Sequence, residues 1–173
     1  MKTDNLEKYL NSFGANVVKD AQTFLSNEKG STDLANTIRF EVTATKDGFA
    51  TKFYMADYGR YIDQGVSGNK KTQSYTDYKG IQQTSQFKYK TKQPPPSILT
   101  RWIKKKGIKG RDKKGRFITH KSLAFLIGRS IKKRGIKSLS FFQKPFGIWY
   151  GQLQHDLLKE VKEDIQTYLT TWT

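Results

Sequence analysis

Apolar residues recur at steps of three and four positions near both ends of the chain. Over residues 4–29 they form one stripe, made of Leu6, Leu10, Phe13, Val17, Ala21 and Phe24. A second stripe closes the chain, made of Tyr150, Leu153, Leu157, Val161, Ile165, Tyr168 and Trp172. This spacing places apolar side chains on one helix face. The pattern therefore predicts a long amphipathic helix at each end.

Single residues inside these segments refine the expectation. Gly14 interrupts the first helix at a cost of about 1 kcal/mol relative to Ala, which indicates a close packing contact there. Gly30 is expected to end that helix. Pro145 is expected to break the aromatic segment 139–150, with the closing helix after it. The polar residues of the closing helix are expected on its outer face: Asp156, Lys159, Glu160, Glu163, Asp164 and Gln166.

Between the helices the pattern changes to alternation of apolar and polar residues over 37–56, which predicts a β-hairpin. The segment TIRFEVTA is followed by the turn signal Asp47-Gly48 and the return strand FATKFYMA. Two strands alone are not stable, so a third or fourth is expected among residues 66–92. Residues 66–93 read either as a long extended loop or as a hairpin with turns at Gly68 and Lys79-Gly80.

Two basic phrases are nearly identical: RWIKKKGIKG at 101–110 and RSIKKRGIKS at 129–138. Each resembles the end of a helix, with cations in the last turn, where they complement the helix dipole. Gly107 and Gly135 are then expected in the left-handed C′ position, and the isoleucine that follows each is expected to fold back on its helix. The phrases therefore predict two short helices with the same terminator.

The starts of these two short helices are also marked. Prolines 94–96 break the chain and can begin the first helix, and Thr119 is a good N-cap for the second. The segment between them, GIKGRDKKGRF at 107–117, is expected to be a mobile loop. Together the patterns predict an α+β fold. Its long terminal helices pack on a small antiparallel sheet, and 1–173 forms a single domain whose basic insertion, 67–137, carries the two short helices.

Charge is concentrated in the middle of the chain. Residues 67–147 hold 22 Lys/Arg against 2 Asp/Glu, whereas 1–66 hold 8 against 9 and 148–173 hold 2 against 4. A field of this strength indicates a polyanion, an acidic protein surface or water beside it. The candidate interface or DNA-facing residues are Lys104, Lys105, Lys106, Lys109, Arg111, Lys113, Lys114, Arg116, Lys132, Lys133 and Arg134.

Residues that commonly carry catalysis are sparse. The chain has no Cys, and His120 and His155 are 35 positions apart and match no metal-binding motif. Asp57 and Asp63 flank YGRYI and could serve a metal-dependent nuclease, but Asp beside Gly is ordinary turn chemistry. We therefore expect no enzyme, no catalytic residue, no metal and no cofactor. The start, MKTDNLEKYL, lacks the apolar core of a secretory signal, and no run is long enough to span a membrane.

Nucleic-acid binding is one function that the residues support. Aromatic residues that could stack on bases are interleaved with the cations: Tyr75, Tyr78, Phe87, Tyr89 and Trp102. No helix-turn-helix, zinc finger or RNA-recognition motif is visible. Binding through residues 67–137 would therefore depend on the phosphate backbone and on salt, without regard to sequence. A basic surface that faces an acidic protein fits the same residues.

The order of three phrases resembles a known family. STDLANTIRFEV follows the first helix, YGRYIDQGVSG follows the hairpin, and KPF precedes the closing helix. This is similar to the tail-completion and head–tail joining proteins of long-tailed bacteriophages. The matching residues are Leu34, Ile38, Tyr58, Tyr61, Ile62, Asp63, Gly65, Pro145 and Phe146. The chain departs from the family pattern at Asp33, Gly59 and Val66, where Gly, Ala and Thr are usual.

The resemblance implies a structural protein of the virion neck or tail that acts by assembly. It implies a homo-oligomeric ring of about 12 or about 6 copies that joins the head, on the portal side, to the tail. The partners would be other neck, portal or tail proteins, and the basic segment would meet acidic neighbours or packaged DNA. The implied location is the virion, with the host cytoplasm before assembly and no membrane. The alternative is the sequence-independent nucleic-acid-binding protein described above.

Overall fold

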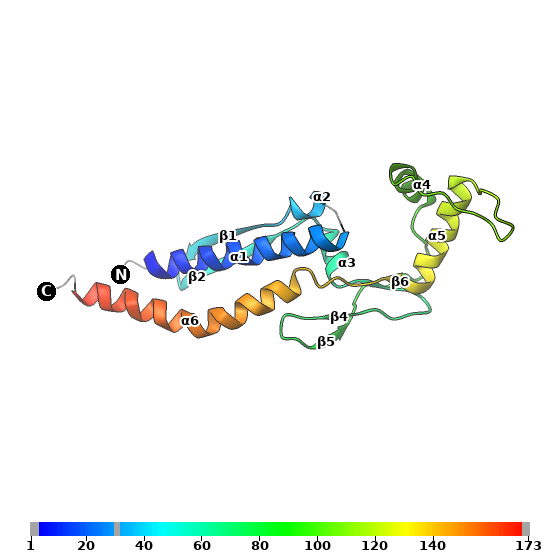
Figure 1. Cartoon of the computed structure of the whole chain (residues 1–173). Coiled ribbons are helices and arrows are strands. Elements are labelled where there is room, and N and C mark those ends of the chain that lie inside the picture. Colours follow the sequence, from blue (N-terminus) through cyan, green and yellow to red (C-terminus); the bar gives the residue numbers. More distant parts are fainter. Residues whose placement is uncertain (1–3, 30–31, 171–173) are drawn as a thin grey trace. The chain divides into compact units, whose positions relative to one another are not determined.

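The computed structural model describes residues 4–29 and 32–170, and its fold is α+β (Figure 1). The predicted Gly30 stop and the Trp172 end of the closing stripe lie outside the described residues. The helices are α1 (Asp4–Lys29), α2 (Thr32–Ala35), α3 (Gly59–Asp63), α4 (Pro96–Lys105), α5 (His120–Arg134) and α6 (Gln143–Thr170). The strands are β1 (Arg39–Thr45), β2 (Gly48–Tyr54), β3 (Val66–Ser67), β4 (Ser74–Thr76), β5 (Gln82–Thr84) and β6 (Gly135–Ile136).

The chain divides into two compact units. The terminal unit comprises residues 1–63, 76–81 and 140–173, and the basic unit comprises residues 64–75 and 82–139. The terminal unit holds both long helices and the β1–β2 hairpin. The basic unit holds α4, α5 and the short β3–β6 pair. The second unit therefore covers nearly the same residues as the basic segment 67–137.

In the terminal unit, α1 packs against α6 and on the β1–β2 hairpin, as the sequence pattern predicts (Figure 1). The predicted close contact at Gly14 is confirmed, because a Cβ there would overlap the ring of Phe40. Phe146 of α6 lies at the centre of an aromatic cluster, with its ring centroid 6.0 Å from Phe13 and 5.8 Å from Phe53. These large side chains fill the space between the two helices and the hairpin.

The expected third strand of the hairpin sheet is not where the pattern placed it. The sheet has only β1 and β2, paired from Arg39 opposite Tyr54 to Thr45 opposite Gly48. The strands within 66–92 instead pair as β3–β6 and β4–β5. The predicted turn at Lys79-Gly80 is present, with Gly80 at a φ of 79°. The hairpin is stabilised by side-chain burial against α1 and α6, which replaces the missing strands.

The expectation that Pro145 breaks the chain is wrong. α6 begins at Gln143, so Pro145 is its third residue and is buried. A first-turn residue has no intrahelical partner for its N–H, and the loss of that N–H in proline therefore costs the helix nothing.

The polar face predicted for α6 is also partly wrong. Asp164 is buried and accepts hydrogen bonds from the backbone N–H groups of Asn5 and Leu6, at 3.2 and 3.1 Å. Asp156 accepts a hydrogen bond from the Tyr9 hydroxyl at 3.2 Å, and burial, followed by this bond, raises the pKa of Tyr9. Asp164 follows Phe146 by about five turns of 3.6 residues and therefore lies on the same face. Ile165, expected inside, is exposed.

The two basic phrases end their helices in different ways. After α4, Gly107 has φ 64°, its N–H donates to Lys104 O, and the Ile108 N–H donates to Ile103 O. This pair of bonds is the predicted Schellman terminator. After α5, Gly135 has φ 79° and ψ −167° and starts β6, so the same prediction is wrong for the second copy. Ile136 pairs with Val66 and does not fold back on α5.

The carbonyl groups at the end of α5 find partners elsewhere in the basic unit. The N–H groups of Asn69 and Lys70 donate to Lys132 O and Lys133 O, at 2.9 and 3.0 Å. The backbone passes close enough that a Cβ on Gly135 would overlap the Val66 carbonyl oxygen. The second glycine is therefore required by a backbone crossing, whereas nothing lies within 4 Å of a Cβ at Gly107.

This difference makes the two glycines a matched pair for mutagenesis. We expect Gly107→Ala to lower the free energy of unfolding by about 1–2 kcal/mol, the cost of a left-handed residue with a side chain. Gly135→Ala should cost at least about 3 kcal/mol, because it adds a backbone overlap and disrupts β3–β6. Urea unfolding followed by circular dichroism measures both. An equal loss of unfolding free energy in the two variants would show that the close backbone approach at Gly135 adds no cost.

Asp164 provides a second test, within the terminal unit. Replacing it with Ala leaves two N–H groups at the start of α1 without their acceptor and should cost about 1 kcal/mol or more. Glu163→Ala, at the neighbouring exposed position, is the control and should change stability by less than about 0.5 kcal/mol. Thermal unfolding of both variants measures the difference. A loss no greater in Asp164→Ala than in Glu163→Ala would show that the cap does not stabilise the fold.

Candidate polyanion-binding surface

The basic unit carries almost all of the excess positive charge. It has 20 Lys and Arg residues against one carboxylate, Asp112, while the rest of the chain has 12 against 14 Asp and Glu residues. Within residues 4–29 and 32–170 one ion pair forms, between Arg116 and Asp112 at 3.0 Å. The remaining cations of the unit are therefore available to an external anion.

The segment between the two short helices, predicted to be a mobile loop, forms a hairpin turn. Arg111 bridges to Phe117, and the Asp112 carboxylate accepts hydrogen bonds from the N–H groups of Lys114 and Arg116, each at 2.9 Å. The Arg116 N–H, as the largest cause, holds the pKa of Asp112 below its ordinary value. The single acidic residue of the unit thus organises a turn, and the exposed cations Lys113 and Lys114 lie at its tip.

Phe117 is an exposed aromatic residue that the sequence analysis missed. Its side chain is 62% exposed, with the Arg111 guanidinium 4.3 Å and the Lys109 ammonium 5.9 Å from the ring centroid. Its position directly after a turn rich in Lys and Arg is the sequence feature from which its exposure could have been predicted. The predicted stacking residues Trp102 and Tyr78 are 44% and 37% exposed, and the Tyr78 ring centroid lies 5.6 Å from that of Phe146 in the terminal unit.

The other predicted cations lie at the ends of the two short helices. Lys104 and Lys105 form the last turn of α4, and Lys106 is its C-cap. The last turn of α5 is formed by Lys132, Lys133 and Arg134. α4 and α5 pack against each other, and Leu99 of α4 lies over Gly128, where a Cβ would be 3.3 Å from Leu99 Cδ1.

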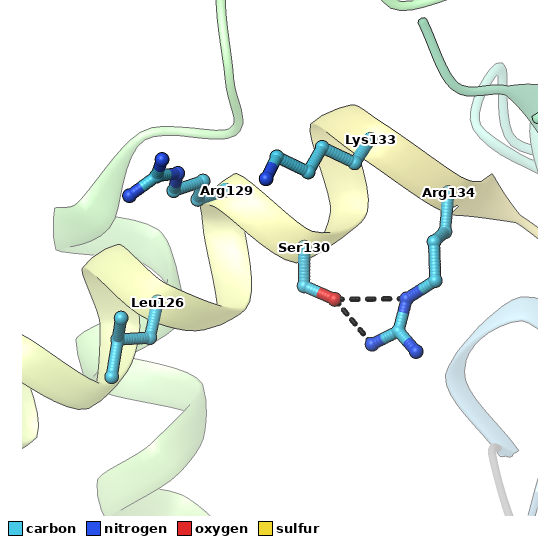
Figure 2. A pocket seen from close by; sticks show the side chains of 5 residues that line it. All are labelled: Leu126, Arg129, Ser130, Lys133 and Arg134. Atoms are coloured by element: carbon cyan, nitrogen blue, oxygen red, sulfur yellow. Dashed lines mark hydrogen bonds between the residues drawn. The ribbon is translucent and has the colours of Figure 1, made fainter. Parts of the chain in front are cut away.

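A pocket of about 520 Å³ lies on the surface of α5 (Figure 2). It is lined by Leu126, Arg129, Ser130, Lys133 and Arg134. In Figure 2 the side chains of Arg129 and Lys133 extend from successive turns of the helix, and Arg134 reaches back to Ser130. Of these residues, Lys133 and Arg134 belong to the predicted interface residues, whereas Arg129 does not.

The residues that carry the phage-family resemblance fall into two groups. Tyr58 and Tyr61 are 46% and 41% exposed. Pro145 is buried, Phe146 is the centre of the aromatic cluster, and Gly65 has φ 72°. A Cβ on Gly65 would lie 2.7 Å from Ser138 N, so this glycine is required by a close backbone approach.

Asp63 joins the middle phrase to the start of α6. Its buried carboxylate accepts hydrogen bonds from Phe142 N at 2.8 Å and Gln143 N at 3.4 Å, and its carbonyl accepts from Ser140 N at 2.9 Å. Among the described residues, no group of three or more His, Cys, Asp or Glu residues could hold a metal ion. Asp63, weighed as a nuclease carboxylate, caps the start of the closing helix through these hydrogen bonds.

Because Asp63 is buried, its contribution to folding stability depends on pH. Burial raises the pKa of its carboxyl above the ordinary 3.8, opposed by the backbone N–H bonds. A raised folded-state pKa means that the folded chain binds the proton more tightly than the unfolded chain. The contribution of Asp63 to stability is therefore largest below the unfolded pKa and declines as the pH rises through the folded pKa.

We expect the stability of the wild type relative to Asp63→Asn to fall as the pH is raised from about 3 to about 7. Asp57→Asn, at an exposed position, controls for the loss of one carboxylate. Urea unfolding across this pH range measures the difference. A wild-type advantage that grows with pH would mean that the ionised carboxylate is favoured by its site.

Comparisons of the chain with protein-family models, with curated proteins and with solved structures find no match. Within the described part of the chain, no helix is both long and apolar enough to cross a membrane. The resemblance to phage head–tail joining proteins therefore stays a prediction from the three phrases, and the function is argued from the residues themselves.

Proposed function

We propose that the chain is a structural subunit of the neck or tail of a long-tailed bacteriophage, which assembles as a ring that joins head to tail. The observation that carries the proposal is that the middle family-like phrase contacts the residues just before the Pro-Phe phrase. Asp63 lies in the middle phrase and caps α6 beside the Pro-Phe phrase, 79 positions further along the chain. The middle phrase thus fixes the start of the helix that contains the Pro-Phe phrase.

A second observation supports assembly. Leu158, Ile165 and Leu169 are 77%, 42% and 61% exposed. Their spacing of seven and four positions places them on one face of α6, away from the buried Asp164. An exposed apolar stripe on a long helix is typical of a surface that another subunit covers. In a ring, this surface would contact a different surface of the next copy.

A sequence-independent nucleic-acid-binding protein is the second candidate function. It is favoured by the charge of the basic unit, which holds 20 Lys and Arg residues. Within the described residues, one of these cations is paired with a carboxylate, in the ion pair between Arg116 and Asp112. The two functions are compatible, because a neck subunit can expose its basic unit to DNA that passes through the ring. They differ in whether the chain is a component of the finished particle.

The particle itself provides the test. Quantitative mass spectrometry of purified virions, from a phage that encodes the chain, should find it at a fixed ratio to the portal protein. A phage deleted for the gene should fail to join heads to tails and should recover when the chain is supplied from a plasmid. Intact, infectious particles without the chain would overturn the proposal.

The apolar stripe provides a variant for the same complementation assay. Leu158→Asp with Leu169→Asp should fold, because both side chains are exposed, yet reduce plaque formation by at least about tenfold through loss of the subunit contact. Gln152→Asp with Gln166→Asp adds the same number of carboxylates at exposed polar positions of α6 and should complement normally. Equal complementation by both double variants would remove the stripe from the assembly surface.

A further inference from the structure

The pocket on α5 combines three cations with a hydroxyl group. Arg129 and Arg134 are exposed, Ser130 and Lys133 are half-buried, and Leu126 forms an apolar edge that is 52% exposed (Figure 2). All five residues come from the last three turns of one helix. Their relative positions are therefore fixed by helix geometry, with no contribution from any other part of the chain.

The cations in this pocket are not neutralised by the protein. The ion pair of the described residues joins Arg116 and Asp112, which do not line the pocket. Arg129 and Lys133 are one turn apart on the helix, where like charges repel each other. An anion placed between them would convert this repulsion into two attractive contacts.

Ser130 fixes the guanidinium of Arg134. Its Oγ accepts hydrogen bonds from Nε, at 3.1 Å, and from one Nη atom of Arg134. A guanidinium has five N–H donors, so three remain after these two bonds. Because the side chain is already held in place, less conformational entropy is lost when the remaining donors bind a planar or tetrahedral oxyanion.

The helix dipole opposes an anion at this end of α5, but its effect is weaker than that of the positively charged side chains in the pocket. A helix C-terminus carries about half a negative charge, against three full positive charges in the pocket. Two of the terminal carbonyls are also occupied, since Asn69 and Lys70 donate to Lys132 O and Lys133 O. The same contacts bring Lys70 and Lys71 to this end of the helix. The net field at the pocket therefore favours an anion.

We propose that the α5 pocket binds a backbone phosphate of duplex nucleic acid, without regard to sequence. Arg129, Lys133 and Arg134 line one pocket, and arginine and lysine are typical phosphate ligands. The exposed Leu126 can contact the adjoining sugar. The further cations on the 110–118 hairpin would contact neighbouring phosphates along the strand. This inference concerns the free chain and does not depend on ring assembly.

The test compares two variants of equal charge. In the α5 variant, Arg129, Lys133 and Arg134 are all changed to Gln, and in the α4 control Lys104, Lys105 and Lys106 are changed to Gln. Fluorescence anisotropy with a labelled duplex of random sequence should show a loss of at least tenfold in affinity for the α5 variant. The control should lose no more than about threefold. The slope of log K against log salt should fall by about 2–3 in the α5 variant. Equal losses in both would mean that net charge alone binds DNA and would overturn the site.

A variant without a charge change separates the site from general attraction. Ser130→Ala releases the Arg134 side chain and should lower the affinity about threefold, while Ser130→Thr, which keeps the hydroxyl group, should restore it. Circular dichroism confirms that each variant is folded. Unchanged affinity in Ser130→Ala would contradict the proposed arrangement.

Competition identifies the kind of anion. Inorganic phosphate should displace the duplex from the wild type at lower concentration than chloride does, and this preference should be lost in the α5 variant. Polyglutamate of matched charge should compete less well than unlabelled duplex. If polyglutamate competes as well as the duplex, the pocket is an acidic-protein site and the proposal fails.

Discussion

The cost of taking charged side chains out of water is the constraint that shapes the basic unit. Its 20 Lys and Arg residues cannot leave water without partners, and the unit contains one carboxylate. Its interior is consequently built from few apolar side chains, such as Ile103 and Ala124. Backbone contacts supply further support, above all the close approach of the chain at Gly68 and Gly135. These contacts leave the long cationic side chains free to extend into solvent.

The terminal unit uses its carboxylates differently. Asp164 binds the first N–H groups of α1, and Asp63 binds those at the start of α6. Both are buried, and both come from parts of the sequence far from the helix that they cap. A carboxylate at a helix N-terminus satisfies unpaired N–H donors and complements the dipole. These caps fix the two long helices that carry the aromatic cluster and the exposed apolar stripe.

The division of charge between the units gives each a separate contribution to the proposed role. The terminal unit carries an exposed apolar face on α6, which the proposed ring would cover between subunits. The basic unit supplies arginines and lysines, one group of which is organised around Ser130 on α5. A subunit of a ring around DNA requires both properties, since it must bind its neighbours and tolerate the phosphates that pass through. In the proposed role, the α5 pocket would hold one phosphate at a defined position within an otherwise diffuse positive field.

Local patterns in the sequence determined the element types. The helical stripes, the alternation before Asp47-Gly48, the Thr119 cap and the Gly107 terminator each depend on neighbours a few positions away, so they can be predicted from sequence alone. The charge segregation that marks the candidate surface is likewise a property of composition along the chain.

Tertiary structure alone decided the features that join distant segments. Two nearly identical phrases end differently, because Gly135 meets Val66 and Gly107 meets nothing. Asp63 and Asp164 look like surface residues in sequence, and the helix ends that approach them make them buried caps. The reason is physical: an unpaired N–H group, or a backbone that passes too closely for a Cβ, is a requirement set by a partner far along the chain. No local pattern contains that partner.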